Sequence, residues 1–254
     1  MAAEKGIKGV IYGVHPVEEA LRSGSRAVGA LYLGEGARGG RLREIEELAR
    51  ARGLKVRRVD VRALDRMVGG AVHQGVVAEA DARPTLDLDE VLAGLDETEA
   101  ATIVVLDGVQ DPHNLGAVVR NAALTGAVAV LIPKDRSAGV TPVVEKVAAG
   151  GLEHVKVIRA GNIAQALRRL KDEGFWIYGA AGEAGAEDLY RVAFASRAVI
   201  VLGEEHDGLR RLTRELCDSL VRIPSTGVID SFNLGTASGI ILSRVYSERQ
   251  HRSA

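Results

Sequence analysis

The sequence predicts an α/β protein built in two parts, and three features of its 254 residues support that fold class. Short apolar segments alternate with helix-type patterns along the whole chain. In the second part these segments are nearly continuous, which is typical of strands buried on both faces of a parallel sheet. The charge also changes along the chain, and this change indicates where the two parts meet.

The charge distribution gives the expected domain boundaries. Residues 1–83 hold 15 Lys and Arg against 11 Asp and Glu, and residues 100–254 hold 18 against 17. Between them, residues 84–99 hold six acidic side chains and no basic one. We therefore expect a basic first domain at residues 6–82, an acidic linker at 83–99 and a second domain at 100–254.

The first domain is expected to be a small layer of strands and helices. The pattern predicts strands at 9–13, 28–34, 54–60 and 73–80, with helices at 15–24, 41–53 and 61–69. The apolar face of the second helix consists of Leu42, Ile45, Leu48 and Ala49. Basic side chains follow on its other faces and in the next strand: Arg41, Arg43, Arg50, Arg52, Lys55, Arg57 and Arg58. They either point into solvent or face RNA, and the sequence leaves both interpretations open.

A glycine pattern in the first domain offers an alternative function. Gly34, Gly36 and Gly39 have the G-x-G-x-x-G spacing of dinucleotide-binding loops, and Asp60 follows at the distance of a ribose-binding acid. The next strand, LKVRRVD, is more basic than the buried strands of a nucleotide-binding sheet. We therefore favour a flexible loop over a dehydrogenase site, which titration with a nicotinamide cofactor would detect.

The second domain is expected to be a parallel sheet covered by helices on both faces. The pattern predicts strands at 102–107, 127–133, 175–181, 198–203 and 220–224, separated by helical segments. Ligands of such sheets bind beyond the carboxyl ends of the strands. The loops after three of these strands carry the polar residues that such a site needs.

The first of these loops leads into a helix within DPHNLGAVVRNA, residues 111–122. Asn114 is expected to cap this helix. The core stripe of the helix is Leu115, Val118, Val119 and Ala122. Arg120 points away from the stripe, on the side of Gly116. Because glycine has no side chain, we expect room for an anion to approach the backbone beside the guanidinium.

The second and third loops follow the strands at 198–203 and 220–224. Glu204 and Glu205 come where the first of these strands gives way to a helix, a position where acids often complement the helix dipole. The other loop is rich in small and hydroxylated residues and leads into the last helix. In that helix Gly235 and Gly239 lie one turn apart, which indicates close packing against a second backbone, between domains or between subunits.

Composition argues against several classes of protein. No apolar stretch approaches the roughly 20 residues needed to cross a bilayer, and the N-terminus lacks a signal-peptide core, so a cytoplasmic protein is expected. Cys217 is the only cysteine, which excludes an internal disulfide and a multi-cysteine metal site. We expect Cys217 to be a buried structural thiol, and we predict no metal site.

The three loops occur in the order of the sequence motifs of one family. The chain resembles the SpoU/TrmH family of RNA ribose 2′-O-methyltransferases through LDGVQDPHNLGAVVRNA, PKDRSAG, LGEEHDGLRRLTRELCD and IPSTGVIDSFNLGTASGI. GVHPVEEAL and GAVHQGVVAEA resemble the two ends of that family's N-terminal, L30e-like RNA-binding domain. The likeness covers nearly the whole chain, and it is strongest to members that methylate a guanosine ribose in the P loop of 23S ribosomal RNA.

The resemblance implies a SPOUT-type catalytic domain whose chain forms a deep trefoil knot, a rare exception to unknotted topology. In this family the knotted loops bind S-adenosylmethionine. Its members are homodimers whose interface builds the active site, and the last helix takes part. By their positions in the motifs, the residues implied to contact the methyl donor are Gly203, Ile223 and Phe232. Those implied to form the active site are Asn114, Arg120, Glu205, Ser231 and Asn233.

Arg120 occupies the position proposed as the base in this family, but a guanidinium stays protonated at physiological pH. We expect it instead to bind the adjacent phosphate and to stabilise the developing alkoxide. Glu205 is expected to orient Arg120 or a partner group, and Lys134 and Arg136 are expected to contact RNA. Relatives commonly read SLNVSVA where this chain reads SFNLGTA, so any role of the second serine is unsupported at Gly235.

The expected substrate is structured RNA and not DNA, because the target is a ribose 2′-hydroxyl. Relatives with the same motifs modify both tRNA and rRNA, so a tRNA methyltransferase stays open as an alternative. A knotted, RNA-binding dimer without catalytic activity is the alternative from a different class. No membrane partner is expected.

Overall fold

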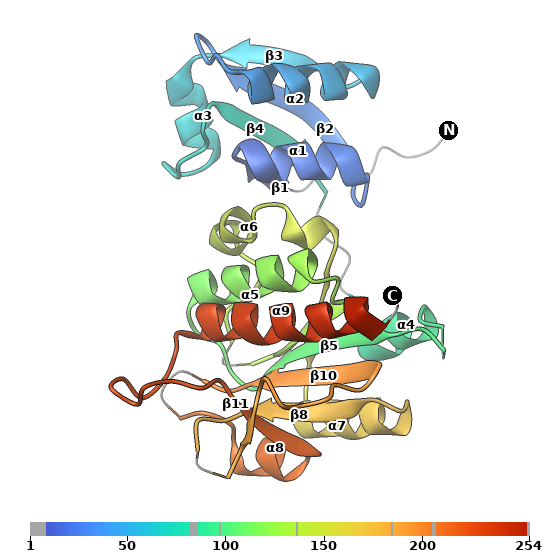
Figure 1. Cartoon of the computed structure of the whole chain (residues 1–254). Coiled ribbons are helices and arrows are strands. Elements are labelled where there is room, and N and C mark those ends of the chain that lie inside the picture. Colours follow the sequence, from blue (N-terminus) through green and yellow to red (C-terminus); the bar gives the residue numbers. More distant parts are fainter. Residues whose placement is uncertain are drawn as a thin grey trace. The chain divides into compact units, whose positions relative to one another are not determined.

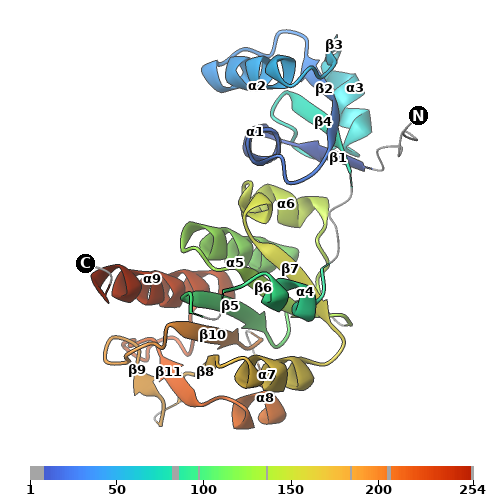
Figure 2. The ribbon, with the colours of Figure 1, turned by 90° about the vertical axis from the view of Figure 1, so that its right-hand side faces the viewer.

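The computed structural model describes residues 9–81, 86–96, 98–135, 137–183, 185–204 and 207–252. The chain forms two compact units, Met1–Pro84 and Thr85–Ala254, which we call unit 1 and unit 2 (Figures 1 and 2). Two of the residues singled out above, Arg136 and Glu205, lie outside the described residues.

Unit 1 is a four-stranded sheet with helices on both faces. Its elements are β1 (Gly9–Tyr12), α1 (Val14–Ser23), β2 (Val28–Gly34), α2 (Gly40–Ala51), β3 (Val56–Val59), α3 (Val61–Met67) and β4 (Val76–Ala80). The strand order is β1-β4-β2-β3, in which β2 and β3 are parallel and the other pairs are antiparallel. Apolar residues of α1 and α2 form the larger core on one face of the sheet, and α3 covers the other face. The predicted apolar face of α2 is confirmed, since Ile45 and Ala49 are fully buried.

Unit 2 is a seven-stranded sheet in which every pairing is parallel. Its first elements are α4 (Leu88–Ala93), β5 (Ala101–Leu106), α5 (Pro112–Leu124), β6 (Ala129–Pro133), α6 (Pro142–Ala148), η1 (Gly151–Glu153) and β7 (Lys156–Ala160). The remaining elements are α7 (Ile163–Asp172), β8 (Trp176–Ala180), β9 (Glu187–Asp188), β10 (Arg197–Leu202), α8 (Arg211–Glu215), β11 (Ser219–Arg222) and α9 (Leu234–Arg252). The parallel sheet and its five expected strands are confirmed, and β7 and β9 are added at the two edges.

Helices cover both faces of this sheet, as predicted (Figure 1). Residues of α5, α6 and α9 pack against one face, and residues of α4, α7 and the α8 segment pack against the other. The strand order is β7-β6-β5-β10-β8-β11-β9, so β5, β10 and β8 lie in the interior of the sheet. All six residues of β5 are buried, which explains its unbroken apolar sequence.

The close helix contact predicted from Gly235 and Gly239 exists, but its partner is α5 of the same unit. A Cβ at Gly235 would lie 2.8 Å from the Cβ of Ala117, and one at Gly239 would lie 3.2 Å from Asn121. Asn121 donates from Nδ2 to the Gly235 carbonyl at 2.8 Å and to the Ser238 hydroxyl at 2.9 Å. The expectation of a contact between domains or subunits at these glycines is therefore corrected, because α9 folds back onto α5.

Gly116 also differs from the expectation. A Cβ there would lie 2.6 Å from the Cβ of Val147 and 3.1 Å from the Val144 carbonyl oxygen. The space beside Gly116 is thus filled by α6 and is not open to an anion. Among the described residues, no helix combines the length and apolar character needed to cross a membrane. Within the same residues, no group of three or more His, Cys, Asp or Glu is placed to hold a metal ion.

Candidate active site

A cavity of about 890 Å³ lies at the carboxyl ends of three neighbouring strands of unit 2. Ala180, Leu202 and Arg222, the last residues of β8, β10 and β11, are all part of its lining. The loops that follow these strands and the first turns of α9 complete the wall. This position agrees with the general location of ligands in open parallel sheets.

The cavity brings together four of the residues singled out in the sequence. Gly203, Ile223, Ser231 and Phe232 all line it, although the loops that carry them are separated by about twenty residues of chain. Glu205 lies outside the described residues, but its neighbours Glu204 and Asp207 also line the cavity. The expected contact residues for a methyl donor therefore share one space.

Gly203 has a steric reason to be glycine. The Glu204 amide donates to the Gly208 carbonyl at 3.1 Å, and the Gly208 amide donates back to the Glu204 carbonyl at 3.0 Å. This turn returns so closely that a Cβ at Gly203 would lie 2.1 Å from the Gly208 carbonyl carbon. Only a residue without a side chain lets the wall of the cavity close here. The helix α8 begins later, at Arg211, so Glu204 stands in a turn and not at a helix N-terminus.

The buried side chain of Asp107 supports this wall of the cavity. The sequence pattern did not mark it as a site residue. Its side chain is 1% exposed at the end of β5. The carboxylate accepts hydrogen bonds from the Arg210 amide at 2.7 Å and from the Thr213 hydroxyl at 2.8 Å. A buried carboxylate is stable only when such donors surround it. Asp107 could have been predicted from its position, because it is an acid directly after the apolar run TIVVL, where a strand of a parallel sheet ends.

The first and third loops meet through a pair of asparagines. Asn233 donates from Nδ2 to Asn114 Oδ1 at 2.9 Å. The predicted cap role of Asn114 is wrong: Asp111 caps α5 by accepting from the His113 amide, and Asn114 is the third residue of the helix. Asn233 has the cap role instead, because its Oδ1 accepts from the Gly235 and Thr236 amides at the start of α9.

Arg120 is placed differently from the other expected residues. Its side chain is exposed on α5, and it makes no hydrogen bond or ion pair with any described residue. It is not among the residues that line the cavity. Arg120 stands six residues after Asn114, about 9 Å further along the helix axis. Asn114 and Asn233 are not among the lining residues either, but Asn233 lies between Phe232 and Leu234, which are, and it bonds to Asn114. Within one chain, no such connection links Arg120 to the cavity among the described residues.

The charges of the cavity wall are only partly paired. Arg214 donates from Nη1 to Glu183 Oε2 at 2.6 Å, and Glu204 pairs with Arg210 at 3.2 Å. In the described part of the chain, the carboxylates of Asp207 and Asp230 and the guanidinium of Arg222 have no such partner. The remaining wall is largely apolar: Leu202, Leu209, Ile223, Phe232, Leu234 and Ile241. Such a site can take a ligand with an apolar ring system and charges of both signs.

Two family models match the chain. Residues 101–243 match the SpoU rRNA Methylase family, and residues 10–86 match the domain described as RNA 2′-O ribose methyltransferase substrate binding. A 23S rRNA (guanosine-2′-O-)-methyltransferase RlmB from Xanthomonas axonopodis pv. citri (strain 306) is 46% identical over 94% of this chain and 96% of its own length. The protein of the same name from Vibrio vulnificus (strain CMCP6) is 40% identical over 94% of this chain and 96% of its own length.

The fold is similar to that of a solved structure. The SpoU methyltransferase AviRb from Streptomyces viridochromogenes, in complex with AdoMet, superposes with a TM-score of 0.76. The match covers 95% of this chain and 90% of that one, at 22% sequence identity. This likeness concerns the fold of the two units.

Proposed function

The chain belongs to the SpoU rRNA methylase family, and from this we propose that it methylates the ribose 2′-hydroxyl of a guanosine in 23S ribosomal RNA with S-adenosylmethionine as the donor. The observation that carries the proposal is the 46% identity to a relative with this activity in its name, over 94% of the chain. The cavity that unites Gly203 with Ile223 and Phe232 supports it as well, because these residues come from two separate motifs.

The cavity suits the proposed donor. Its volume of about 890 Å³ lies in the range of small-molecule sites. S-adenosylmethionine supplies an activated methyl group when bound. Gly203, Ile223 and Phe232 would hold its adenosine part, while the free carboxylates of Asp207 and Asp230 favour its cationic groups. The guanidinium of Arg222 is available for its carboxylate.

The remaining task of the chain is to align the ribose hydroxyl and to stabilise the negative charge that develops on it. Arg120 is suited to this task because its guanidinium is always protonated and has no partner among the residues that the structure describes. We assign to it the binding of the phosphate next to the target ribose and the stabilisation of the alkoxide, while the proton passes to water or to a neighbour. Ser231 and the pair of Asn114 and Asn233 form the polar edge of the site.

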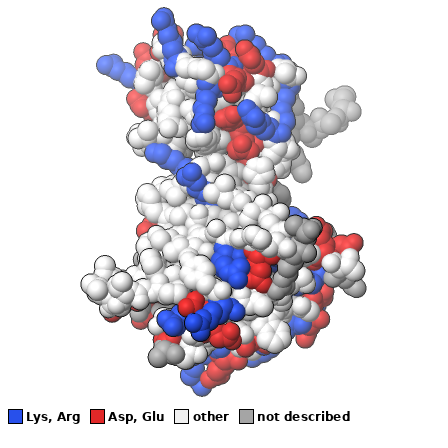
Figure 3. Space-filling model, in the orientation of Figure 1, with Lys and Arg blue, Asp and Glu red and all other residues white. Residues whose placement is uncertain are grey.

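Because Arg120 stands outside its own cavity, we propose that it serves the cavity of a second copy in a homodimer. Exposed apolar side chains on α5 and on the two helices packed against it support an interface: Leu124 on α5, one turn after Arg120, is 72% exposed, and Val143 on α6 and Tyr246 on α9 are 37% and 44% exposed. Figure 3 shows that the surface over α5 and α6 is largely uncharged. The knotted passage of the chain and the orienting role of Glu205 remain part of the same proposal.

Transfer of tritium-labelled methyl groups from S-adenosylmethionine to 23S ribosomal RNA tests the activity. We expect Arg120→Ala to lower kcat by on the order of 10²–10³-fold, since it removes one preorganised charge, while calorimetry shows donor binding preserved. Arg168→Ala is the matched control, because Arg168 is an exposed arginine of α7 on the opposite face of the sheet. Near-normal turnover of Arg120→Ala would refute this role. Transfer to tRNA alone would favour the tRNA alternative, and no transfer to any RNA would favour a non-catalytic RNA-binding dimer.

Mixing two inactive variants tests the shared site. If Arg120 serves the partner's cavity, a dimer of Arg120→Ala with Asn233→Ala contains one complete site, so mixing and re-equilibrating the variants should restore part of the activity. Light scattering should show a dimer in both variants. Mixed dimers without any activity would contradict the shared site.

The proposed substrate also implies that the protein is in the cytoplasm. Fluorescence microscopy of a tagged chain can test this location.

A further inference from the structure

Unit 1 has a cavity of its own, of about 290 Å³, at the carboxyl ends of its parallel strands β2 and β3. Leu33 and Arg58 contribute from these strands. The loop of residues 37–39 and the first two turns of α2 form the rest of the wall. This loop belongs to the glycine pattern LGEGARGG, which the proposed methyl transfer leaves without a role.

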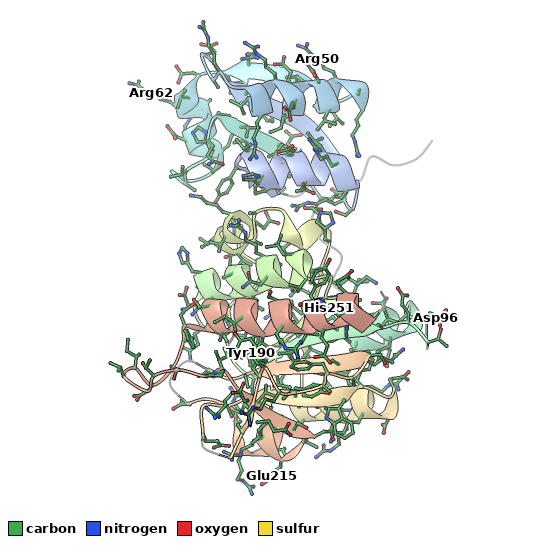
Figure 4. The ribbon with its side chains drawn as sticks, in the orientation of Figure 1. Arg50, Arg62, Asp96, Tyr190, Glu215 and His251 are labelled. Carbon is green, nitrogen blue, oxygen red and sulfur yellow. The ribbon has the colours of Figure 1, made fainter. Side chains whose placement is uncertain are left out.

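The arginines of α2 and β3 fall into two groups. The first group has protein partners: Arg50 and Arg58 each donate to Glu46 at 2.6 Å, and Arg52, directly after α2, donates to the Arg22 carbonyl at 3.1 Å. Arg41 Nη1 lies 2.8 Å from His15 Nε2, and the Arg57 guanidinium lies 5.8 Å from the centre of the Tyr32 ring. Figure 4 shows Arg50 at the outer surface of unit 1, on α2. These side chains agree with the interpretation that this face of α2 points into solvent, where its arginines interact with nearby residues of the same unit.

The second group lies at the cavity. Arg38 and Arg43 both line it, both are exposed, and neither makes a hydrogen bond or ion pair with a described residue. Glu46 is the one acid among the lining residues, and its two arginine partners already offset its charge. The cavity is therefore electropositive and has two cationic side chains available for a ligand. Figure 3 shows Lys and Arg side chains spread over this unit, with acids among them. The cavity therefore differs from the rest of the unit's surface because Arg38 and Arg43 are unpaired among the described residues, and not because it holds more arginines.

The backbone at the cavity is open as well. Gly36 and Gly39 have φ of 78° and 157°, and no atom lies within 4 Å of a Cβ built at either position or at Gly40. The helix α2 begins at Gly40 and receives no side-chain cap, so its first amides are available. Backbone amides at such a position add to the attraction that Arg38 and Arg43 exert on an anion.

The cavity does not suit the dinucleotide that the glycine pattern also suggests. Its volume of about 290 Å³ is at the lower limit of small-molecule pockets. Asp60, the expected ribose-binding acid, instead caps α3 by accepting from the Arg62 amide at 2.7 Å. The strand β3 is an exposed edge strand, as its basic sequence predicted. A single phosphate group matches the size and the charge better.

We propose that Arg38, Arg43 and the glycine loop before α2 bind a backbone phosphate of the RNA substrate. The inference rests on the proposed function for the identity of the ligand, and it separates Arg38 and Arg43 from the arginines of α2 and β3 that have protein partners. Binding of one phosphate by two guanidinium groups fixes the position of the RNA and is independent of its base sequence.

The test measures binding of the full chain to a transcript of 23S ribosomal RNA over a series of potassium chloride concentrations. We expect Arg38→Ala and Arg43→Ala each to weaken binding and to lower the slope of log affinity against log salt by about one. The matched control is Arg52→Ala, which removes the same charge from the C-terminal end of α2 but leaves the cavity intact. Thermal unfolding of each variant verifies that unit 1 is folded.

Three results would overturn the inference. Normal RNA affinity of both cavity variants would remove the site, and an equal loss in Arg52→Ala would mean that only the overall charge matters. Binding of NAD⁺ that depends on Arg38 would assign the cavity to a dinucleotide instead. Methyl transfer by the unsubstituted chain is measured in parallel. If transfer occurs while the cavity variants bind RNA normally, only this inference fails, whereas absence of transfer refutes the proposed function.

Discussion

At the scale of single residues, the buried carboxylate of Asp107 connects β5 to the wall of the proposed donor site. It accepts from the Arg210 amide and the Thr213 hydroxyl, and both groups follow directly after the turn of Glu204 and Gly208. Asp107 is not among the described residues that line the cavity. It is therefore a positioning residue, whose effect reaches the ligand through the turn.

Substitution of Asp107 by Asn should weaken binding of S-adenosylmethionine about tenfold, because a hydrogen bond to a charged group contributes about 1.5–3 kcal/mol and Asn keeps only part of it. Isothermal titration calorimetry measures the affinity. Asp111→Asn is the control, since asparagine caps a helix as well as aspartate does. Equal affinities of Asp107→Asn and the unsubstituted chain would show that the turn needs no such support.

Cys217 illustrates how burial decides the chemistry of a side chain. Cys217 is partly buried, and this partial removal from water raises the pKa of its thiol to about 12, while the neighbouring carboxylate of Asp218 acts in the same direction. Because only the thiolate is nucleophilic, the folded protein should react slowly with a disulfide reagent at pH 8. The reaction should accelerate strongly in denaturant, where the pKa returns toward 9.0. Rapid reaction of the folded chain would contradict the structural role.

At the scale of elements, the packing of α5 against α9 holds the first and third motifs together. Two glycines of α9 allow the close approach, and Asn121 of α5 joins the helices through the Gly235 carbonyl and the Ser238 hydroxyl. The same contact places Asn233 at the start of α9 within reach of Asn114. The geometry of the polar edge of the site thus depends on the distance between two helices.

Gly235→Ser, which restores the residue common in relatives, should destabilise this chain. A Cβ at position 235 would lie 2.8 Å from that of Ala117, so the helices must separate, at a cost of about 1–3 kcal/mol. Urea unfolding measures the change in the free energy of unfolding. Thr236→Ser, at an exposed neighbouring position, should leave it nearly unchanged. A neutral Gly235→Ser variant would mean that α9 can shift without loss.

At the scale of the whole molecule, the two units have separate cores. The two apolar clusters of unit 1 contain no residue of unit 2, and the two clusters of unit 2 contain none of unit 1. The proposed RNA-phosphate site and the proposed donor site accordingly lie in different units. Binding of the RNA and binding of the donor can therefore be separated by dividing the chain.

A fragment of residues 85–254 should fold alone and bind S-adenosylmethionine like the full chain, because its core and its cavity are complete. Its affinity for RNA should fall and should depend less on salt, since the phosphate contacts of unit 1 are lost. Circular dichroism, calorimetry and RNA titration measure the three properties. An unfolded fragment, or one with unchanged RNA affinity, would refute this division.

The fold class and the family were predictable from the amino-acid pattern alone. Strands such as β5 and β10 are buried on both faces, so their sequences are nearly continuous apolar runs, which can be recognised without knowing the neighbouring strands. The edge strand β7 was missed because Lys156 and Arg159 interrupt its apolar pattern at the exposed edge of the sheet. The motifs of the three loops identified the family because their order and spacing are retained together.

The contacts of these residues depend on the folded chain and were not predictable from local pattern. A cap depends on where the backbone turns, so Asn233 and not Asn114 caps a helix. A glycine shows that something approaches closely but not what it is, and both Gly116 and Gly235 face neighbouring helices of their own unit. The same holds for charge. The sequence shows how many arginines unit 1 contains, but only the fold shows that Glu46 pairs with both Arg50 and Arg58. Contacts between residues distant in sequence are set by the packing of the folded chain, so the local sequence pattern does not predict them.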